Sequence, residues 1–309
     1  MSELQTICII GAADNLYAQH LAVAFVSLLV NLAPGWKCRF YVADGDITPE
    51  NRLLLTRSVQ RHGGEIKFLK VEREHFNDLF IAEGRHITQA SYYRLVIPEM
   101  LRDEPVEKVI YLDCDLIVRD DISQMLLVPI GDHPIGAVED LGGAFRLADL
   151  CIPEGSAYFN SGVLLINLPK WRDEDVSNRV FRFVRENPHR MHYHDQDGLN
   201  AVLHGRWLHL HPKWNVQRNM FGRIDAPPDK IGMFKQAVKN PSIVHFTGNS
   251  KPWHYDNAHP YKKEYYRYLS LTEWKHFKPA FGLKLMFKKW ARLLLPDALL
   301  SFVRRYRFR

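Results

Sequence analysis

Two aspartates lie two residues apart directly after an apolar run of the sequence. Lys108–Leu112 reads Lys-Val-Ile-Tyr-Leu, and Asp113 and Asp115 follow it with Cys114 between them. Two carboxylates past the end of a buried strand face one point if the backbone turns there. Hard oxygen ligands suit Mg²⁺ or Mn²⁺, ions that usually also hold substrate phosphates. A D-x-D motif is common, however, and the alternative is that one aspartate caps the next turn while the other is solvated.

A histidine, a glycine and a lysine follow one another at intervals of three residues, as His245, Gly248 and Lys251. The apolar residues before His245 predict a strand that delivers it, and Gly248 lets the backbone approach a ligand closely. Imidazole together with two carboxylates suits Mn²⁺, and the glycine and lysine suit a diphosphate. The alternative is an ordinary loop with a core histidine and a surface lysine.

Two further polar clusters border apolar segments. Asn160 opens a strand-like run, where it could hydrogen-bond a sugar hydroxyl or simply form a turn. Asp195, Gln196 and Asp197 precede the helical segment Gly198–His204. If Asp197 is the N-cap of that helix, Asp195 and Gln196 are free to face a ligand. Their function would then be hydroxyl recognition or transition-state stabilisation.

Alternating strands and helices are predicted to position these residues. This alternation is typical of an α/β fold with a single, mostly parallel sheet and crossover helices. Ligands of such sheets bind outside the carboxyl ends of the strands, where Asp14 and the D-x-D motif both fall. The predicted strands are Gln5–Ile10, Cys38–Val42, Glu65–Val71, Lys108–Leu112, Pro134–Val138 and Val163–Asn167; the predicted helices are Leu16–Leu32, Pro49–His62, Thr88–Leu101, Glu174–Glu186 and Asp197–His204, and Pro212–Pro241 is expected to be rich in loops.

The composition predicts a soluble or peripheral globular protein. The 309 residues are 46% hydrophobic and 25% charged, which excludes disordered and fibrous classes. The four cysteines are scattered without a C-x-x-C pair, so a reducing, cytoplasmic setting is expected. Met1–Ile10 lacks the basic start of a secretory signal, and the best apolar run, Leu21–Val30, is far shorter than a membrane span.

Positive charge is concentrated in residues 275–309, which hold ten Lys and Arg against a single acidic residue, Asp297. The rest of the chain has a slight acidic excess, so a nucleic-acid groove across the main body is not expected. Apolar residues including Trp290 recur at helical spacing, beside a basic stripe that begins at Lys284. This pattern is typical of a helix that lies on an anionic membrane surface. The alternative is that the helix packs on the main domain.

Taken together, the motifs resemble those of the family 8 glycosyltransferases, retaining enzymes with the A-type nucleotide-sugar-binding fold. The resemblance runs from about Ile7 to Trp253, with the motifs in the family's order and approximate spacing. The most similar group is the bacterial galactosyl- and glucosyltransferases that build lipopolysaccharide or lipooligosaccharide. The matching stretches are Gly11-Ala12-Ala13-Asp14, Ser91-Tyr92-Tyr93-Arg94-Leu95, Asp113-Cys114-Asp115, Phe159-Asn160-Ser161-Gly162-Val163, Asp195-Gln196-Asp197, and His245 to Trp253 with Gly248 and Lys251.

The resemblance implies a UDP-sugar donor, a glycan or lipid-linked oligosaccharide acceptor, and Mn²⁺, with Mg²⁺ as the alternative, as cofactor. We expect a catalytic domain over residues 1–272 and a basic aromatic tail over 273–309. The tail would hold a cytoplasmic protein on the inner face of the cytoplasmic membrane. By resemblance, the metal ligands are Asp113, Asp115 and His245; the uridine contacts are Ala12, Asp14 and Tyr17; the diphosphate contacts are Gly248, Lys251 and His86; and Arg94, Asp140, Asn160, Asp195 and Gln196 line the donor sugar.

Asp195 and Gln196 are the catalytic candidates, and retention leaves two mechanisms open for them. One forms a covalent intermediate on the protein, and the other is same-face attack by the acceptor hydroxyl while UDP leaves. An amide is a poor nucleophile, and Asp195 is expected to bind a hydroxyl, so same-face attack is favoured, with the departing phosphate accepting the proton. Two other functions stay open: an inactive UDP-sugar-binding module, and a polyanion-binding protein acting through the tail.

Overall fold

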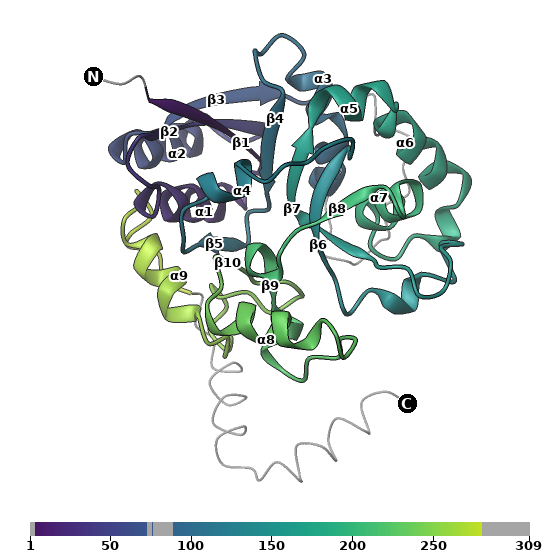
Figure 1. The fold of residues 1–309 in the computed structure, drawn as a ribbon. Helices are drawn as coiled ribbons and strands as arrows, with labels where there is room; N and C mark the ends of the chain where they lie inside the picture. The colour runs from purple at the N-terminus through teal and green to yellow at the C-terminus, as the bar shows by residue number, and fades with distance from the viewer. Residues whose placement is uncertain (1–3, 73–75, 77–88, 280–309) are drawn as a thin grey trace.

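The computed structural model describes residues 4–72, 76 and 89–279, and a seven-stranded sheet forms its centre (Figure 1). The strand order is β3-β2-β1-β4-β7-β6-β8. Strands β3, β2, β1 and β4 run parallel, as do β6 and β8, whereas β7 is antiparallel to both of its neighbours. The predicted α/β fold with a mostly parallel sheet flanked by helices is confirmed. The strands are β1 (Gln5–Asp14), β2 (Trp36–Gly45), β3 (Glu65–Lys70), β4 (Lys108–Leu112), β6 (Ile135–Glu139), β7 (Phe159–Asn167) and β8 (Trp207–His209).

Helices cover both faces of this sheet. On one face, the helices α1, α2 and α8 pack in a hydrophobic core that includes Ile7 and Ile9 of β1. On the other face, α5, α6 and α7 pack in a core that includes Ile10 of the same strand. Burial on both faces is typical of strands in a largely parallel sheet. The helices are α1 (Ala18–Val30), α2 (Pro49–Arg61), α3 (Ile97–Met100), α4 (Ser123–Leu126), α5 (Leu168–Asp173), α6 (Val176–Glu186), α7 (Asp195–Leu203), α9 (Lys262–Leu269) and α8 (Ile231–Lys239), the last within a segment expected to be loops.

The apolar segment Leu21–Val30 belongs to the core helix α1. Every residue of α1 from Ala18 to Leu28 is buried, because the helix contacts the central sheet, α2, α9 and the short strand β5 (Leu116–Val118). Such all-round burial explains why the helix has no polar face. Among the described residues, no helix is both long enough and apolar enough to span a membrane.

A second, three-stranded sheet was not predicted from the sequence. It has the order β5-β10-β9, with β10 (Ile243–His245) antiparallel to β5 and parallel to β9 (Val216–Gln217). Strands of two or three residues are too short to show an alternating pattern. The pairing places His245 opposite Leu116, next to the second aspartate of the D-x-D motif. This small sheet therefore joins two motifs that lie far apart in the sequence.

The predicted helix Thr88–Leu101 is helical in the part that the structure describes, but its helix type changes along its length. Residues Gln89–Val96 form a 3₁₀-helix, and the short α3 follows it. Pro98 has no N–H to donate to the carbonyl group of Arg94, and its ring would clash with that carbonyl in an α-helix. Pro98 instead lies in the first turn of α3, where a helix tolerates proline.

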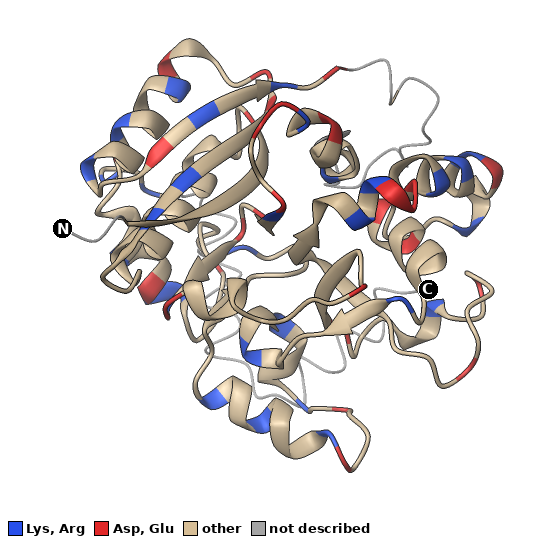
Figure 2. Cartoon of the chain, turned by 45° about the horizontal axis from the view of Figure 1, so that its top comes forward, with Lys and Arg blue, Asp and Glu red and all other residues tan. Residues whose placement is uncertain are grey.

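Charged residues of both signs are interspersed along the outer helices of the described chain (Figure 2). The basic tail beyond residue 279 and the diphosphate candidate His86 both lie outside the described residues. The last described segment does contact the domain, since Trp274 and Phe277 pack against buried residues and Glu273 pairs with Arg61 at 2.5 Å.

Candidate active site

A cleft of about 1180 Å³ lies at one edge of the central sheet. It is bordered by the carboxyl ends of β1 and β4 and by the start of antiparallel β7, which reaches the same edge. Every predicted site residue that the structure describes lines this cleft, and their individual roles remain predictions. These residues are Ala12, Asp14, Tyr17, Arg94, Asp113, Asp115, Asp140, Asn160, Asp195, Gln196, His245, Gly248 and Lys251.

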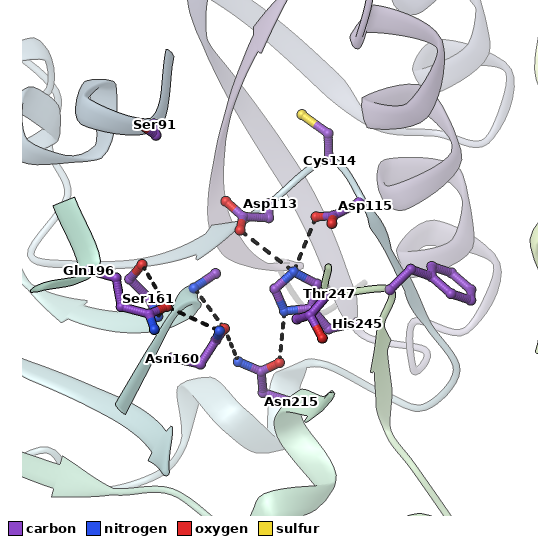
Figure 3. A network of polar contacts seen from close by, with 12 residues as sticks. Ser91, Asp113, Cys114, Asp115, Asn160, Ser161, Gln196, Asn215, His245 and Thr247 are labelled. Carbon is purple, nitrogen blue, oxygen red and sulfur yellow. Dashed lines mark hydrogen bonds and ion pairs between the residues drawn. The ribbon is translucent and has the colours of Figure 1, made fainter. Parts of the chain in front are cut away.

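Asp113, Asp115 and His245 converge within the cleft (Figure 3). One ligand atom from each residue lies within 4.8 Å of those of the other two. His245 Nε2 is 3.1 Å from Asp115 Oδ1 and 3.6 Å from Asp113 Oδ2. The space between them depends on Gly162, where a Cβ atom would lie 2.3 Å from His245 Cε1 and 2.4 Å from Asp113 Oδ2. Two carboxylates and an imidazole in this arrangement fit a divalent cation such as Mn²⁺.

Lys251 adds a positive charge to this cluster. Its ammonium group pairs with Asp115 Oδ2 and donates to the carbonyl oxygen of Phe246 at 2.9 Å. Burial alone would raise the pKa of Asp115, but Lys251 and the His245 ring outweigh burial and hold that pKa below its usual value. Asp115 therefore stays ionised, as a metal ligand must.

Arg94 joins the metal-ligand cluster to Asp195. Its guanidinium group is buried and lies 3.1 Å from Asp113 Oδ1 and 2.9 Å from Asp195 Oδ2, with its carbon 4.6 Å from the centre of the Tyr111 ring. Tyr111 also donates its hydroxyl to Asp113 at 2.7 Å. Burial lowers the pKa of Arg94, but Asp113 and Asp195 outweigh that effect and raise it. Arg94 thus holds two carboxylates of the cleft in fixed positions.

The charge state of buried Asp195 should make the free energy of unfolding of the protein depend on pH. Burial raises the pKa of Asp195 to about 6, although Arg94 opposes the rise. A carboxyl group whose pKa is higher in the folded than in the unfolded state stabilises the folded protein below the unfolded pKa of about 3.9. This stabilisation is lost as the pH rises through the folded pKa of about 6. The difference in free energy of unfolding between Asp195→Asn and the wild type should therefore change with pH. It should shift by about 2 kcal/mol in favour of the variant as the pH rises from 4 to 7.5. Urea unfolding in EDTA measures this difference, and a difference independent of pH would contradict the prediction.

Gln196 and Asp140 are neighbouring side chains that both line the cleft. Gln196 Nε2 donates to Asp140 Oδ2 at 3.3 Å, and its Oε1 accepts from Asn160 Nδ2 at 3.1 Å. Burial raises the pKa of Asp140, while the N–H groups of Gly142 and Gln196 oppose the rise. These amide and carboxyl groups have the chemistry that recognises sugar hydroxyls.

Asp14 and Tyr17 form the turn between β1 and α1. Asp14 Oδ1 accepts the backbone N–H groups of Leu16 and Tyr17, each at 3.0 Å. The ring of Tyr17 meets the edge of Trp253 at 6.0 Å between centres, and Trp253 stacks on His20 at 3.4 Å. An aspartate that closes its own turn explains part of this sequence motif without a ligand, and the stacked rings support Tyr17 where it lines the cleft.

The interpretation of Asp197 as a helix N-cap is wrong. Helix α7 begins at Asp195 after His194, and Asp197 lies fully buried in the first turn. The carboxylate of Asp197 accepts from the backbone N–H groups of His192 at 2.6 Å and Tyr193 at 2.7 Å, and it pairs with Arg146 at 3.2 Å. Asp197 therefore holds the preceding loop in place, and Asp195 and Gln196 line the cleft on the same turn of helix.

Sequence reasoning missed Asn215. This residue is fully buried, and its Oδ1 lies 3.0 Å from His245 Nδ1. Its Nδ2 donates a hydrogen bond to Asn160 Oδ1 at 2.9 Å. It ends the 3₁₀-helix Pro212–Asn215, in a segment expected to be loops, and its two partners are distant in sequence. No local pattern in a single sequence marks such a residue.

Comparison with known proteins agrees with this geometry. The family model described as Glycosyl transferase family 8 matches residues 8–257. General stress protein A of Bacillus subtilis (strain 168) is 38% identical over 270 residues, which cover 86% of this chain and 94% of that protein. The lipopolysaccharide 1,3-galactosyltransferase of Salmonella typhimurium is 29% identical over 201 residues, which cover 61% of this chain and 56% of that protein.

A solved structure shows the same fold. The crystal structure of the galactosyltransferase LgtC in complex with donor and acceptor sugar analogues matches with a TM-score of 0.77 and 28% identity. The match covers 91% of this chain and 100% of that one. The resemblance predicted from the sequence motifs is confirmed by these comparisons. The chain belongs to glycosyl transferase family 8.

Proposed function

We propose that this protein transfers galactose or glucose from a UDP-sugar to a saccharide hydroxyl, with retention of the anomeric configuration. The proposed acceptor is a glycan or lipid-linked oligosaccharide of lipopolysaccharide or lipooligosaccharide core synthesis, in keeping with the name of the Salmonella typhimurium relative. The observation that carries the proposal is the convergence of Asp113, Asp115 and His245 beside Lys251 in a cleft of about 1180 Å³.

The three converging side chains would hold Mn²⁺, or alternatively Mg²⁺, because their donor set fits a hard or borderline divalent cation. Such an ion, when bound, stabilises the negative charge that develops on the leaving diphosphate. Lys251 would add a second positive charge to the same region. Gly248 lies in the left-handed region with a φ of 81°, and a Cβ atom there would meet nothing within 4 Å. The backbone at Gly248 is therefore open to close approach by a phosphate group.

The contacts of Asp195 support same-face attack over a covalent intermediate on this carboxylate. Asp195 Oδ2 pairs with Arg94 and accepts from Ser161 Oγ at 3.2 Å. An oxygen held by a guanidinium group and a hydroxyl is a weakened nucleophile. Asp195 and Gln196 would instead orient the donor sugar, while the acceptor hydroxyl attacks the anomeric carbon and the departing phosphate takes its proton.

Calorimetric titration of UDP-galactose and UDP-glucose into the full chain, first with Mn²⁺ and then with EDTA, tests this proposal. Metal-dependent binding is expected, and the tighter sugar nucleotide identifies the donor. Asp115→Asn should weaken this binding by about 100-fold because it removes a charged ligand. The matched Asp229→Asn exchange, at an exposed carboxylate outside the cleft, should leave it unchanged. Absence of binding by the folded wild type would overturn the proposal.

The tail is proposed to hold the protein on the inner face of the cytoplasmic membrane. Ten basic residues in 275–309 support this proposal, since each basic residue near an anionic surface contributes about 1 kcal/mol. Because Trp274 and Phe277 pack on the domain, the test truncation should end at Pro279. We expect the full chain to co-sediment with vesicles that contain anionic lipid and the truncated chain to remain in the supernatant. Equal sedimentation of both would contradict the proposal.

A further inference from the structure

A chain of hydrogen bonds connects His245 to Gln196 through two asparagine side chains (Figure 3). His245 Nδ1 lies 3.0 Å from Asn215 Oδ1. Asn215 Nδ2 donates to Asn160 Oδ1 at 2.9 Å, and Asn160 Nδ2 donates to Gln196 Oε1 at 3.1 Å. All four side chains are buried. The chain therefore joins the cluster of metal-binding side chains to the amide that faces the proposed donor sugar.

The backbone fixes the direction of these hydrogen bonds. Gly162 N–H, which can only donate, points at Asn160 Oδ1 at 3.0 Å, so the Asn160 atom there must be an acceptor oxygen. Because that oxygen is an acceptor, the Asn215 atom that faces it must be the donating amino group. Asn215 Oδ1 is then left facing His245 and requires a proton on Nδ1. With that proton on Nδ1, Nε2 is the ring nitrogen directed at the two aspartates.

The same backbone segment orients the other end. Ser161 N–H donates to Gln196 Oε1 at 3.1 Å, which fixes that atom as the oxygen. The amino group of Gln196 is therefore directed at Asp140, inside the cleft. Two consecutive N–H groups at the start of β7 thus set the orientation of every amide in the chain of hydrogen bonds.

We propose that Asn215, held by Asn160, is a positioning residue that fixes the Nδ1–H tautomer of His245 and so presents Nε2 to the divalent cation. The proposal rests on the metal site of the proposed function. Without Asn215, the nearest partner of the ring is Asp115, whose Oδ1 lies 3.1 Å from Nε2. A carboxylate accepts a hydrogen bond, so it would favour a proton on Nε2. Binding of the metal would then require the imidazole to lose that tautomer first.

The tautomer can be measured directly in the metal-free protein. The nitrogen chemical shifts of ¹⁵N-labelled histidine distinguish Nδ1–H from Nε2–H, and the His245 signals are those absent in His245→Gln. We expect a proton on Nδ1 in the wild type and an Nδ1 without a proton in Asn215→Leu, which keeps the size but no hydrogen-bonding group. Asn215→Asp should restore Nδ1–H, because a carboxylate oxygen also accepts from Nδ1. Asn257→Leu, at another buried asparagine whose side chain bonds to Ser250 and His259, is the control that should leave His245 unchanged.

Mn²⁺ affinity, measured by calorimetry with the metal alone, gives the second result. Asn215→Leu should weaken it by about 10- to 100-fold, and Asn215→Asp should recover most of the loss. Absence of Mn²⁺ binding by the wild type would overturn the metal site itself. If the wild type binds Mn²⁺ and Asn215→Leu shows the same Mn²⁺ affinity and the same protonation of His245, only the role of Asn215 would be overturned. If that variant does not fold, an Nε2–H tautomer in the wild type overturns the proposal without it.

Discussion

Replacing Gly162 by alanine should abolish the proposed metal-dependent sugar transfer while the fold is kept. The new Cβ atom would lie 2.3 Å from His245 Cε1 and 2.4 Å from Asp113 Oδ2, far inside contact distance. The backbone cannot yield, because Gly162 N–H donates to Asn160 and its carbonyl oxygen accepts the N–H of Asp113 at 2.8 Å. The two side chains must therefore separate. Displacement of reacting groups by about 1 Å can cost 100-fold in rate, and we expect at least that loss in Mn²⁺ affinity and in turnover.

Gly136→Ala is the matched control for this exchange. Gly136 lies in β6 of the same sheet, and its nearest neighbour would be a side-chain carbon of Leu210 at 3.2 Å, which can move aside. Calorimetry with Mn²⁺, an assay of UDP release and thermal unfolding would be compared for both variants. A Gly162→Ala protein that binds Mn²⁺ as tightly as the wild type would show that the three side chains do not form the metal site.

Much of the fold could be predicted because its strands are long and alternate with helices. Strands β1, β2 and β4 carry continuous apolar runs, and parallel pairing brings their carboxyl ends to one edge. Asp14 and Asp113 could therefore be assigned to the same site from sequence alone. The assignment of His245 to that site relied on residue chemistry and on the order of motifs.

The rest of the site depends on contacts between residues that are distant in sequence. The strands of the small sheet have two or three residues each, too few for a pattern to appear. Asn215 meets Asn160 across 55 positions, and Arg146 meets Asp197 across 51. An asparagine in a loop is typical of a turn, so nothing local separates Asn215 from the others. Asp197 was assigned a local role, capping, whereas its strongest partners come from elsewhere in the fold.

Arg94→Met should lower the free energy of unfolding by about 3–5 kcal/mol at neutral pH, because it removes one partner of a buried ion-pair network. Methionine approximates the length of arginine but carries no charge. Asp195, 3% exposed, and Asp113 would then face each other without the guanidinium group between them. Since burial already raises the pKa of Asp195 to about 6, loss of Arg94 should raise it further. The destabilisation should therefore be larger at pH 7.5 than at pH 5, as measured by urea unfolding in EDTA.

The double variant Arg94→Met/Asp195→Asn separates loss of charge balance from loss of packing. If the unpaired carboxylate of Asp195 causes most of the destabilisation, adding Asp195→Asn to Arg94→Met should recover about half of the lost free energy of unfolding. This recovery should exceed the stability that Asp195→Asn gains in the wild type. Arg172→Met is the control, because Arg172 donates to the carbonyl oxygens of Pro98 and Leu101. Its effect should simply add to that of Asp195→Asn. Additive effects at Arg94 as well would contradict the coupling, since they would mean that the guanidinium group acts through packing rather than through the charge of Asp195.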